Sequence, residues 1–144
     1  MSARSKARKR ALDILFEADS KGVAIPSILA EHVRRRKADD SPALNEYTVT
    51  LVEGVAAHQV VIDERIAGCA EGWSLQRMPD VDRAIARLGT YEILFETDIP
   101  DGVAISEAVN LSTDLSTEDS PRFIAGLLHA IAEKHGSGEA TDSR

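Results

Sequence analysis

The chain has 144 residues, room for one folded domain, and its 43% hydrophobic and 28% charged residues exclude a chain that is disordered throughout. Its one cysteine, Cys69, excludes an intrachain disulfide framework and a zinc ribbon. No stretch reaches the roughly 20 apolar residues of a membrane span, and no signal peptide is apparent, so we expect a cytoplasmic protein without a membrane contact. The net charge of -7 makes the chain acidic, but that total hides an asymmetry between its first ten residues and the rest.

The first ten residues form a basic segment with five cations and no acid, so the remainder of the chain carries -12, five charges beyond the total of -7. The cations are Arg4, Lys6, Arg8, Lys9 and Arg10. Arg4 and Arg8 would lie close to the apolar stripe of the following helix, where unpaired guanidinium groups are costly to bury, so we expect the segment to project beyond the helices as an arm. Such an arm suits a polyanion such as RNA, although many proteins carry one without that role, and the acidic body suits a basic partner.

Apolar residues at the three-and-four spacing of a helix face predict helices over residues 7–18 and 27–36, with Gly22 and Pro26 between them. The second of these helices ends in the cationic run 34–37. We interpret this run as a solvated helix end that opposes the macrodipole, in preference to a second RNA surface.

After a turn at residues 39–42, an apolar face predicts one long helix that ends near Gly68. The face consists of Leu44, Leu51, Val55, Ile62 and Ile66. His58 falls on the same face, and we interpret it as a hydrogen-bonded core residue, because no second histidine lies within a turn to form a metal pair. Residues 71–79, which contain the one tryptophan, predict a short connecting helix.

Three more helices follow. Asp80 begins one whose inward face comprises Val81, Ala84, Ile85, Leu88, Tyr91 and Phe95. Residues 103–114 and 120–134 predict two others, the last preceded by Ser116-x-x-Asp119, a variant of the capping box. Because the alternation typical of strands is missing, the predicted fold class is all-α with about seven helices, followed by a disordered tail at 136–144.

Motifs for a phosphate loop, a dinucleotide site, a zinc protease and a serine hydrolase are all missing from the sequence. Asp80 and Asp82 would diverge by roughly 200° on a helix, so they do not predict an acid/base pair. We therefore expect a protein that is not an enzyme and needs no cofactor or metal. Recognition of RNA bases usually needs exposed aromatic rings, and Phe16 and Phe123 are the candidates.

Several segments in order resemble the NusB family. They are ARKRAL at 7–12, WSLQR at 73–77, VDRAIARL at 81–88, YE at 91–92, DIP at 98–100, VAISEAV at 103–109 and STEDSPRFIAGLL at 116–128. No one segment is diagnostic, but together they span nearly the whole chain except the tail. The chain departs from the family pattern at Ser106 and Ala125, where relatives usually carry asparagine, and Lys9 lacks the guanidinium fork of an arginine.

The resemblance implies one domain over residues 1–135, in which two perpendicular three-helix sub-bundles, about 7–68 and 80–135, pack together. It implies a non-catalytic transcription antitermination factor that binds boxA RNA of ribosomal RNA leader transcripts. The implied partners are the small-subunit ribosomal protein NusE and the RNA polymerase antitermination complex, and a homodimer stays open. The alternative is a NusB-like module that binds protein only, without RNA.

The resemblance also implies site residues by position. Those implied to bind RNA are Arg4, Lys6, Arg8, Lys9, Arg10, Phe16, Arg122 and Phe123, and those implied to lie near the partner are Asp82 and Asp119. We expect Arg8 and Arg10 to contact phosphates and Phe123, mainly on the resemblance, to offer a flat face to a base. Phe123 has the alternative of a core residue, since it immediately precedes the apolar stripe that starts at Ile124.

Overall fold

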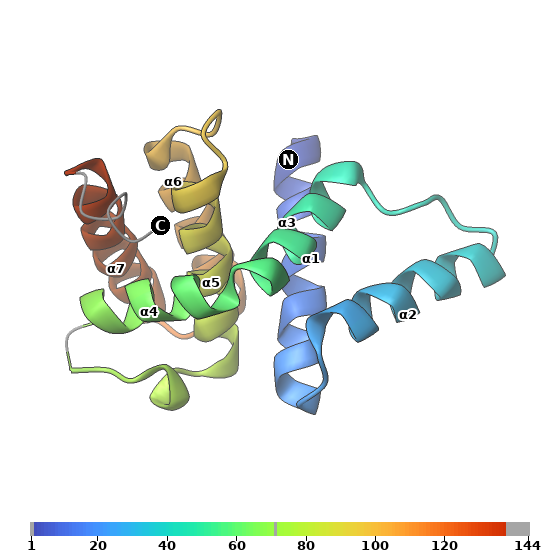
Figure 1. Ribbon diagram of the computed structural model, residues 1–144, viewed down its shortest axis with the longest axis horizontal. Helices are drawn as coiled ribbons and strands as arrows, with labels where there is room; N and C mark the ends of the chain where they lie inside the picture. Colours follow the sequence, from blue (N-terminus) through green and yellow to red (C-terminus); the bar gives the residue numbers. More distant parts are fainter. Residues whose placement is uncertain (1, 71, 138–144) are drawn as a thin grey trace. The chain divides into compact units, whose positions relative to one another are not determined.

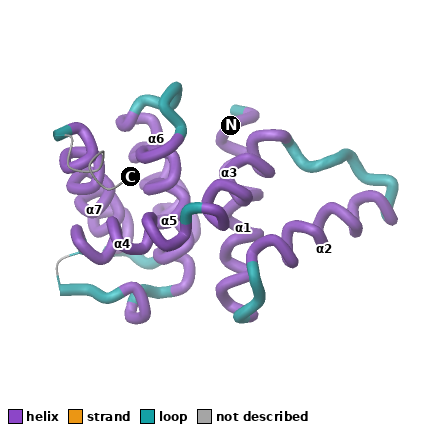
Figure 2. The backbone as a smooth tube through the Cα atoms, viewed as in Figure 1, coloured by secondary structure: helices purple, strands orange, loops and turns teal. Residues whose placement is uncertain are grey.

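The computed structural model describes residues 2–70 and 72–137. Over these residues it contains seven α-helices, one short 3-10 helix and no strand, which confirms the all-α class (Figure 2). The elements are α1 (Ala3–Lys21), α2 (Ile25–Ala38), α3 (Glu46–Ala57), α4 (Gln59–Cys69), η1 (Leu75–Arg77), α5 (Asp80–Phe95), α6 (Asp101–Leu115) and α7 (Ser120–Gly136). None of the described helices is long and apolar enough to cross a membrane. The tail expected to be disordered falls, from residue 138 onward, outside the described residues.

The helices form two compact units, divided between Ala57 and His58. In the first unit α1 packs against α2 and α3, which also contact each other (Figure 1). In the second unit α5, α6 and α7 pack mutually, and α4 contacts α5 and α7. We expected a first sub-bundle that reaches about residue 68, whereas α4 lies with the second unit.

The prediction of one long helix ending near Gly68 is wrong, because the helix breaks at His58 into α3 and α4. His58 adopts φ -115° and ψ 20°. It is exposed rather than in the core, and its ring stacks on that of Phe95 with centroids 4.0 Å apart. The apolar spacing continues across the break because α3 and α4 each carry a buried face, and periodicity does not reveal that the two faces serve different units.

The expectation of a projecting N-terminal arm is also wrong. Helix α1 begins at Ala3, where the Ser2 hydroxyl caps it by accepting a hydrogen bond from the Ser5 backbone N–H at 3.0 Å. It ends as expected at Gly22, whose φ of 65° is the left-handed conformation that glycine tolerates best. All five cations of the basic segment therefore lie on a helix, and helical spacing decides which way each one points.

The end of α2 is closed by the turn predicted at residues 39–42. The Ser41 backbone N–H donates to the Arg36 carbonyl at 2.8 Å, and the Asp40 N–H donates to the Lys37 carbonyl at 3.2 Å. Asp40 has φ 54°, the left-handed conformation that this helix-ending motif requires. The guanidinium of Arg36 also donates to the Pro42 carbonyl at 2.6 Å. Both the backbone and the side chain of Arg36 are thus tied to the loop that follows.

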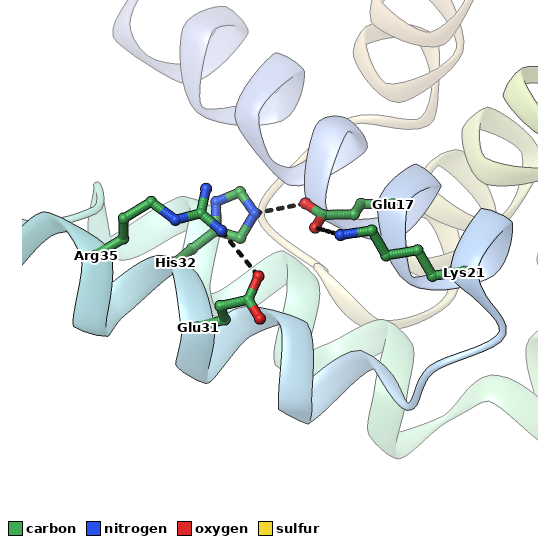
Figure 3. A network of polar contacts seen from close by, with 5 residues as sticks. All are labelled: Glu17, Lys21, Glu31, His32 and Arg35. Carbon is green, nitrogen blue, oxygen red and sulfur yellow. Dashed lines mark hydrogen bonds and ion pairs between the residues drawn. The ribbon is translucent and has the colours of Figure 1, made fainter.

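A carboxylate links α1 to α2 in the first unit. Glu17 accepts hydrogen bonds from Lys21 Nζ at 2.7 Å, within α1, and from His32 Nε2 at 2.8 Å, on α2 (Figure 3). These two hydrogen bonds, that from Lys21 first, lower the pKa of the Glu17 carboxyl from its ordinary 4.5 to about 2. The ionised form is therefore favoured by folding.

This pKa shift predicts an acid-sensitive contribution to stability. Because the folded pKa lies below the unfolded one, the contribution is complete above about pH 4.5 and is lost as the pH falls toward 2. Glu17→Gln should lower the melting temperature near neutral pH, and its deficit against the wild type should shrink over that range. Glu31→Gln is the matched control, because it removes only an exposed ion pair to Arg35 within α2. A deficit that is constant from pH 6 to 2 would show that the shift has no bearing on stability.

Candidate nucleic-acid interface

The cations of α1 divide into stripes with different surroundings. Arg4 and Arg8, one turn apart, both approach the ring of Tyr47 near the start of α3, with guanidinium carbons 4.1 and 5.6 Å from its centroid. Arg8 is only 3% exposed. A cation over an aromatic face recovers part of its desolvation cost, which is why Arg8 can be buried beside the apolar stripe although its charge suggested otherwise. Arg8 is thus held inside the first unit, whereas we expected it to contact phosphates.

Lys6 and Arg10 form a second stripe, also one turn apart. Both are exposed, and their side chains make no ion pair or hydrogen bond with the part of the chain that the structure describes. They border a hollow of about 270 Å³ whose other lining residues include Arg36 of α2 and Asn45. Lys9 differs from both, because its ammonium pairs with Asp13 at 2.8 Å.

Among the candidate residues of the basic segment, the structure therefore brings Lys6 and Arg10 together as free cations. Arg36 joins them in the lining, although its place in the cationic run 34–37 predicted a solvated helix end. Phe16, the aromatic candidate on α1, is 37% exposed. Lys6, Arg10 and Arg36 thus line one basic hollow of the first unit, whereas Phe16 is exposed on α1 and does not line it.

In the second unit, the rings of Trp73 and Phe123 face a shared hollow of about 490 Å³. Their centroids lie 5.9 Å apart, with the planes tilted by 54°. Arg122 and Lys134 also line this hollow, and Trp73 borders a neighbouring one together with Arg77. None of the described residues that line either hollow is acidic, so this part of an acidic chain combines aromatic faces with cations.

Phe123 is half-buried, with its ring in the hollow, while the stripe that follows is buried as predicted. The buried stripe is Ile124, Leu127, Leu128 and Ile131. Trp73 is the residue that sequence reasoning missed. It lies in the loop before η1 and is 51% exposed, which is unusual for the one tryptophan of a chain. Its place in the WSLQR segment, four residues before Arg77, was the available signal.

The two acids assigned to the partner surface have different environments. Asp82, in the first turn of α5, is 4% exposed and accepts hydrogen bonds from the hydroxyls of Ser116 and Ser120, the latter at 2.8 Å. Asp119 is exposed and precedes α7 without a side-chain cap bond. The predicted capping box is therefore wrong, because the N-cap residue of α7 is Asp119, without a side-chain cap bond, and the Ser116 hydroxyl bonds to Asp82 instead of accepting from a backbone N–H of the helix. Asp82 is engaged inside the second unit, and Asp119 is the acid open to a partner.

Known proteins match this fold and sequence closely. A model of the NusB family matches residues 5–133. A transcription antitermination protein NusB of Kineococcus radiotolerans is 53% identical over 133 residues, which is 92% of this chain and 95% of that protein. A solved structure of T. maritima NusB has a TM-score of 0.82 at 31% identity and covers 98% of both chains. A chain in a crystal structure of antitermination factors NusB and NusE in complex with dsRNA has a TM-score of 0.77 at 26% identity, over 90% of this chain and 96% of that one.

The hydrogen bonds of Asp82 predict a structural role for this residue. Asp82→Ala removes the acceptor of two hydroxyls, that of the buried Ser120 and that of the half-buried Ser116, so it should lower the free energy of unfolding by about 1–3 kcal/mol. Asp119→Ala is the matched control, because it removes an exposed carboxylate near the same helix start, and it should change stability by no more than about 0.5 kcal/mol. Urea denaturation measures both values, and equal stabilities of the two variants would contradict this role.

Proposed function

The chain belongs to the NusB family, and we propose that it is a transcription antitermination factor that binds boxA RNA of ribosomal RNA leader transcripts together with the ribosomal protein NusE. In this role the protein works in the cytoplasm with RNA polymerase, by binding and not by catalysis. The names of its relatives support the proposal, as does the similarity to a chain solved with NusE and double-stranded RNA.

The observation that carries the proposal is the hollow formed by Trp73 and Phe123. Exposed aromatic rings offer stacking surfaces for unpaired bases, and the flanking Arg122 and Lys134 suit the phosphates that accompany them. In a chain whose net charge is -7, the described residues that line this hollow include two cations and no acid. These properties fit a single-stranded stretch of RNA.

A protein-only interaction module is the alternative. It would use the acidic parts of the chain, such as the exposed Asp119, to attract a basic partner through interactions that weaken with salt. The aromatic hollow with its cations favours RNA binding over this alternative, because attraction of a basic protein explains neither the cations nor the exposed tryptophan.

A binding titration separates the two functions. Fluorescence anisotropy of labelled boxA RNA and of a scrambled RNA, each with and without NusE, should show preferential binding to boxA that NusE strengthens. The salt concentration must be held constant, because it changes affinity for any RNA. A complex with NusE that has no preference for boxA would favour the protein-only module and refute the proposal.

The two rings should contribute to base recognition more than to charge. Trp73→Ala and Phe123→Ala should each weaken boxA binding by about 1–3 kcal/mol, weaken scrambled RNA less, and leave the salt dependence nearly unchanged. Val60→Ala is the control, because it truncates an apolar side chain of the same unit that is 75% exposed and lines neither hollow. Thermal melting accompanies each titration: binding lost together with a large drop in melting temperature would identify the ring as a core residue and not as a stacking surface.

A further inference from the structure

We propose that the hollow bordered by Lys6, Arg10 and Arg36 is a phosphate-binding site, through which α2 takes part in holding the RNA backbone. This inference rests on the proposed RNA binding and extends it to α2, whose cationic end we expected from the sequence to be only solvated. The RNA would be bound here through its phosphodiesters and without regard to base sequence, since the hollow offers cations and no aromatic ring.

The geometry brings cations from two helices to one place. Lys6 and Arg10 come from α1 and Arg36 from the last turns of α2, with residues at and just before the start of α3 completing the lining. The rest of the lining is Ala3, Ala7, Leu44, Asn45 and Thr48. Since this lining holds three positive charges and no acid, the hollow lacks an internal counter-ion, and an external anion is its natural occupant.

Arg36 is held in place before any ligand arrives. Its guanidinium donates from Nη1 to the Pro42 carbonyl at 2.6 Å, and its own carbonyl accepts from the Ser41 N–H. A guanidinium has five N–H donors, so several stay available for a phosphate oxygen. Because the side chain is already ordered, less conformational entropy is lost when it binds than for a free surface cation.

The neighbours of Arg36 in the cationic run provide the contrast. Arg34 and Lys37 are exposed, lie on the same helix end and carry the same charge, but neither lines the hollow. General attraction of a polyanion by the helix end would involve all of these cations alike. Arg36 differs from Arg34 in lining the hollow and in donating to the Pro42 carbonyl, so a phosphate site in the hollow would involve Arg36 and not Arg34.

A protein carboxylate is the other anion that could occupy such a site. A stable protein contact usually has a buried aromatic or aliphatic anchor at its centre. Here the apolar lining is limited to two alanines and Leu44, while the charge is that of three cations. Three cations beside so small an apolar lining favour the phosphates of RNA, which are recognised by charge and need no apolar anchor.

The decisive experiment compares Arg36→Gln with Arg34→Gln, two variants that remove the same charge from the same helix end. For each, binding of boxA and of scrambled RNA is measured over a series of salt concentrations. Arg36→Gln should weaken both RNAs alike and make the slope of log Kobs against log salt shallower by about 0.7, the value for one phosphate contact with a single strand. Arg34→Gln should leave the slope nearly unchanged, because Arg34 does not line the hollow and so makes no phosphate contact there.

A second variant tests the hollow without touching Arg36. The Asn45 side chain accepts a hydrogen bond from the Tyr47 backbone N–H at 2.7 Å, and an aspartate caps a helix equally well. Asn45→Asp should therefore melt like the wild type, yet it places a negative charge beside the three cations. It should weaken both RNAs several-fold, with a loss that diminishes as salt rises.

The outcomes separate this site from the proposed function. If the wild type binds boxA while Arg36→Gln matches Arg34→Gln and Asn45→Asp binds normally, the phosphate site is refuted and RNA binding stands. If Arg36→Gln and Asn45→Asp impair NusE binding but not RNA binding, the hollow holds a protein carboxylate and the inference is likewise refuted. If the wild type binds neither RNA, the proposed function fails first, and the site fails with it.

Discussion

The start of α7 depends on a buried carboxylate. Asp82 lies in the first turn of α5, where a negative charge is also favoured by the helix dipole, and it accepts hydrogen bonds from Ser116 and Ser120 on either side of the turn into α7. This connection sets where α7 begins, and Arg122 and Phe123 follow within its first turn. Arg122 and Phe123, which are proposed to meet RNA, therefore follow a helix start that is held by an acid that does not itself face solvent.

In the first unit, helical periodicity assigns different tasks to cations that are adjacent in sequence. Residues four apart share a face, so Arg4 and Arg8 both meet Tyr47, whereas Lys6 and Arg10 both border the hollow near Arg36. Lys9 faces another way and is neutralised by Asp13. A segment with five cations thus presents two that are free of protein partners within the described chain, while two others fasten α1 to α3.

Each unit has its own cationic hollow, and the two differ in what they offer a nucleic acid. The hollow of the first unit has three cations and no aromatic ring, which suits phosphates. That of the second unit adds Trp73 and Phe123 to its cations, which suits bases. Phosphate contacts supply affinity and base contacts supply specificity. In the proposed function the first unit therefore contributes mainly to affinity and the second mainly to specificity.

Local sequence patterns were sufficient to predict the all-α class, the start of α5 and the buried stripe of α7. Apolar residues three and four apart define a helix face, strand alternation is missing, and Asp80 directly after Pro79 is a helix-start signal. The family resemblance, together with exposed charge and aromatic character, singled out Lys6, Arg10, Arg122 and Phe123. Local spacing could not predict the break at His58, the burial of Arg8 on Tyr47, the bonds of Asp82 or the meeting of Arg36 with α1. Each of these depends on residues from different elements, often tens of positions apart in sequence. Sequence by itself determined which residues share a face, and only the tertiary structure decided what covers that face, because packing partners are chosen by contacts between distant segments.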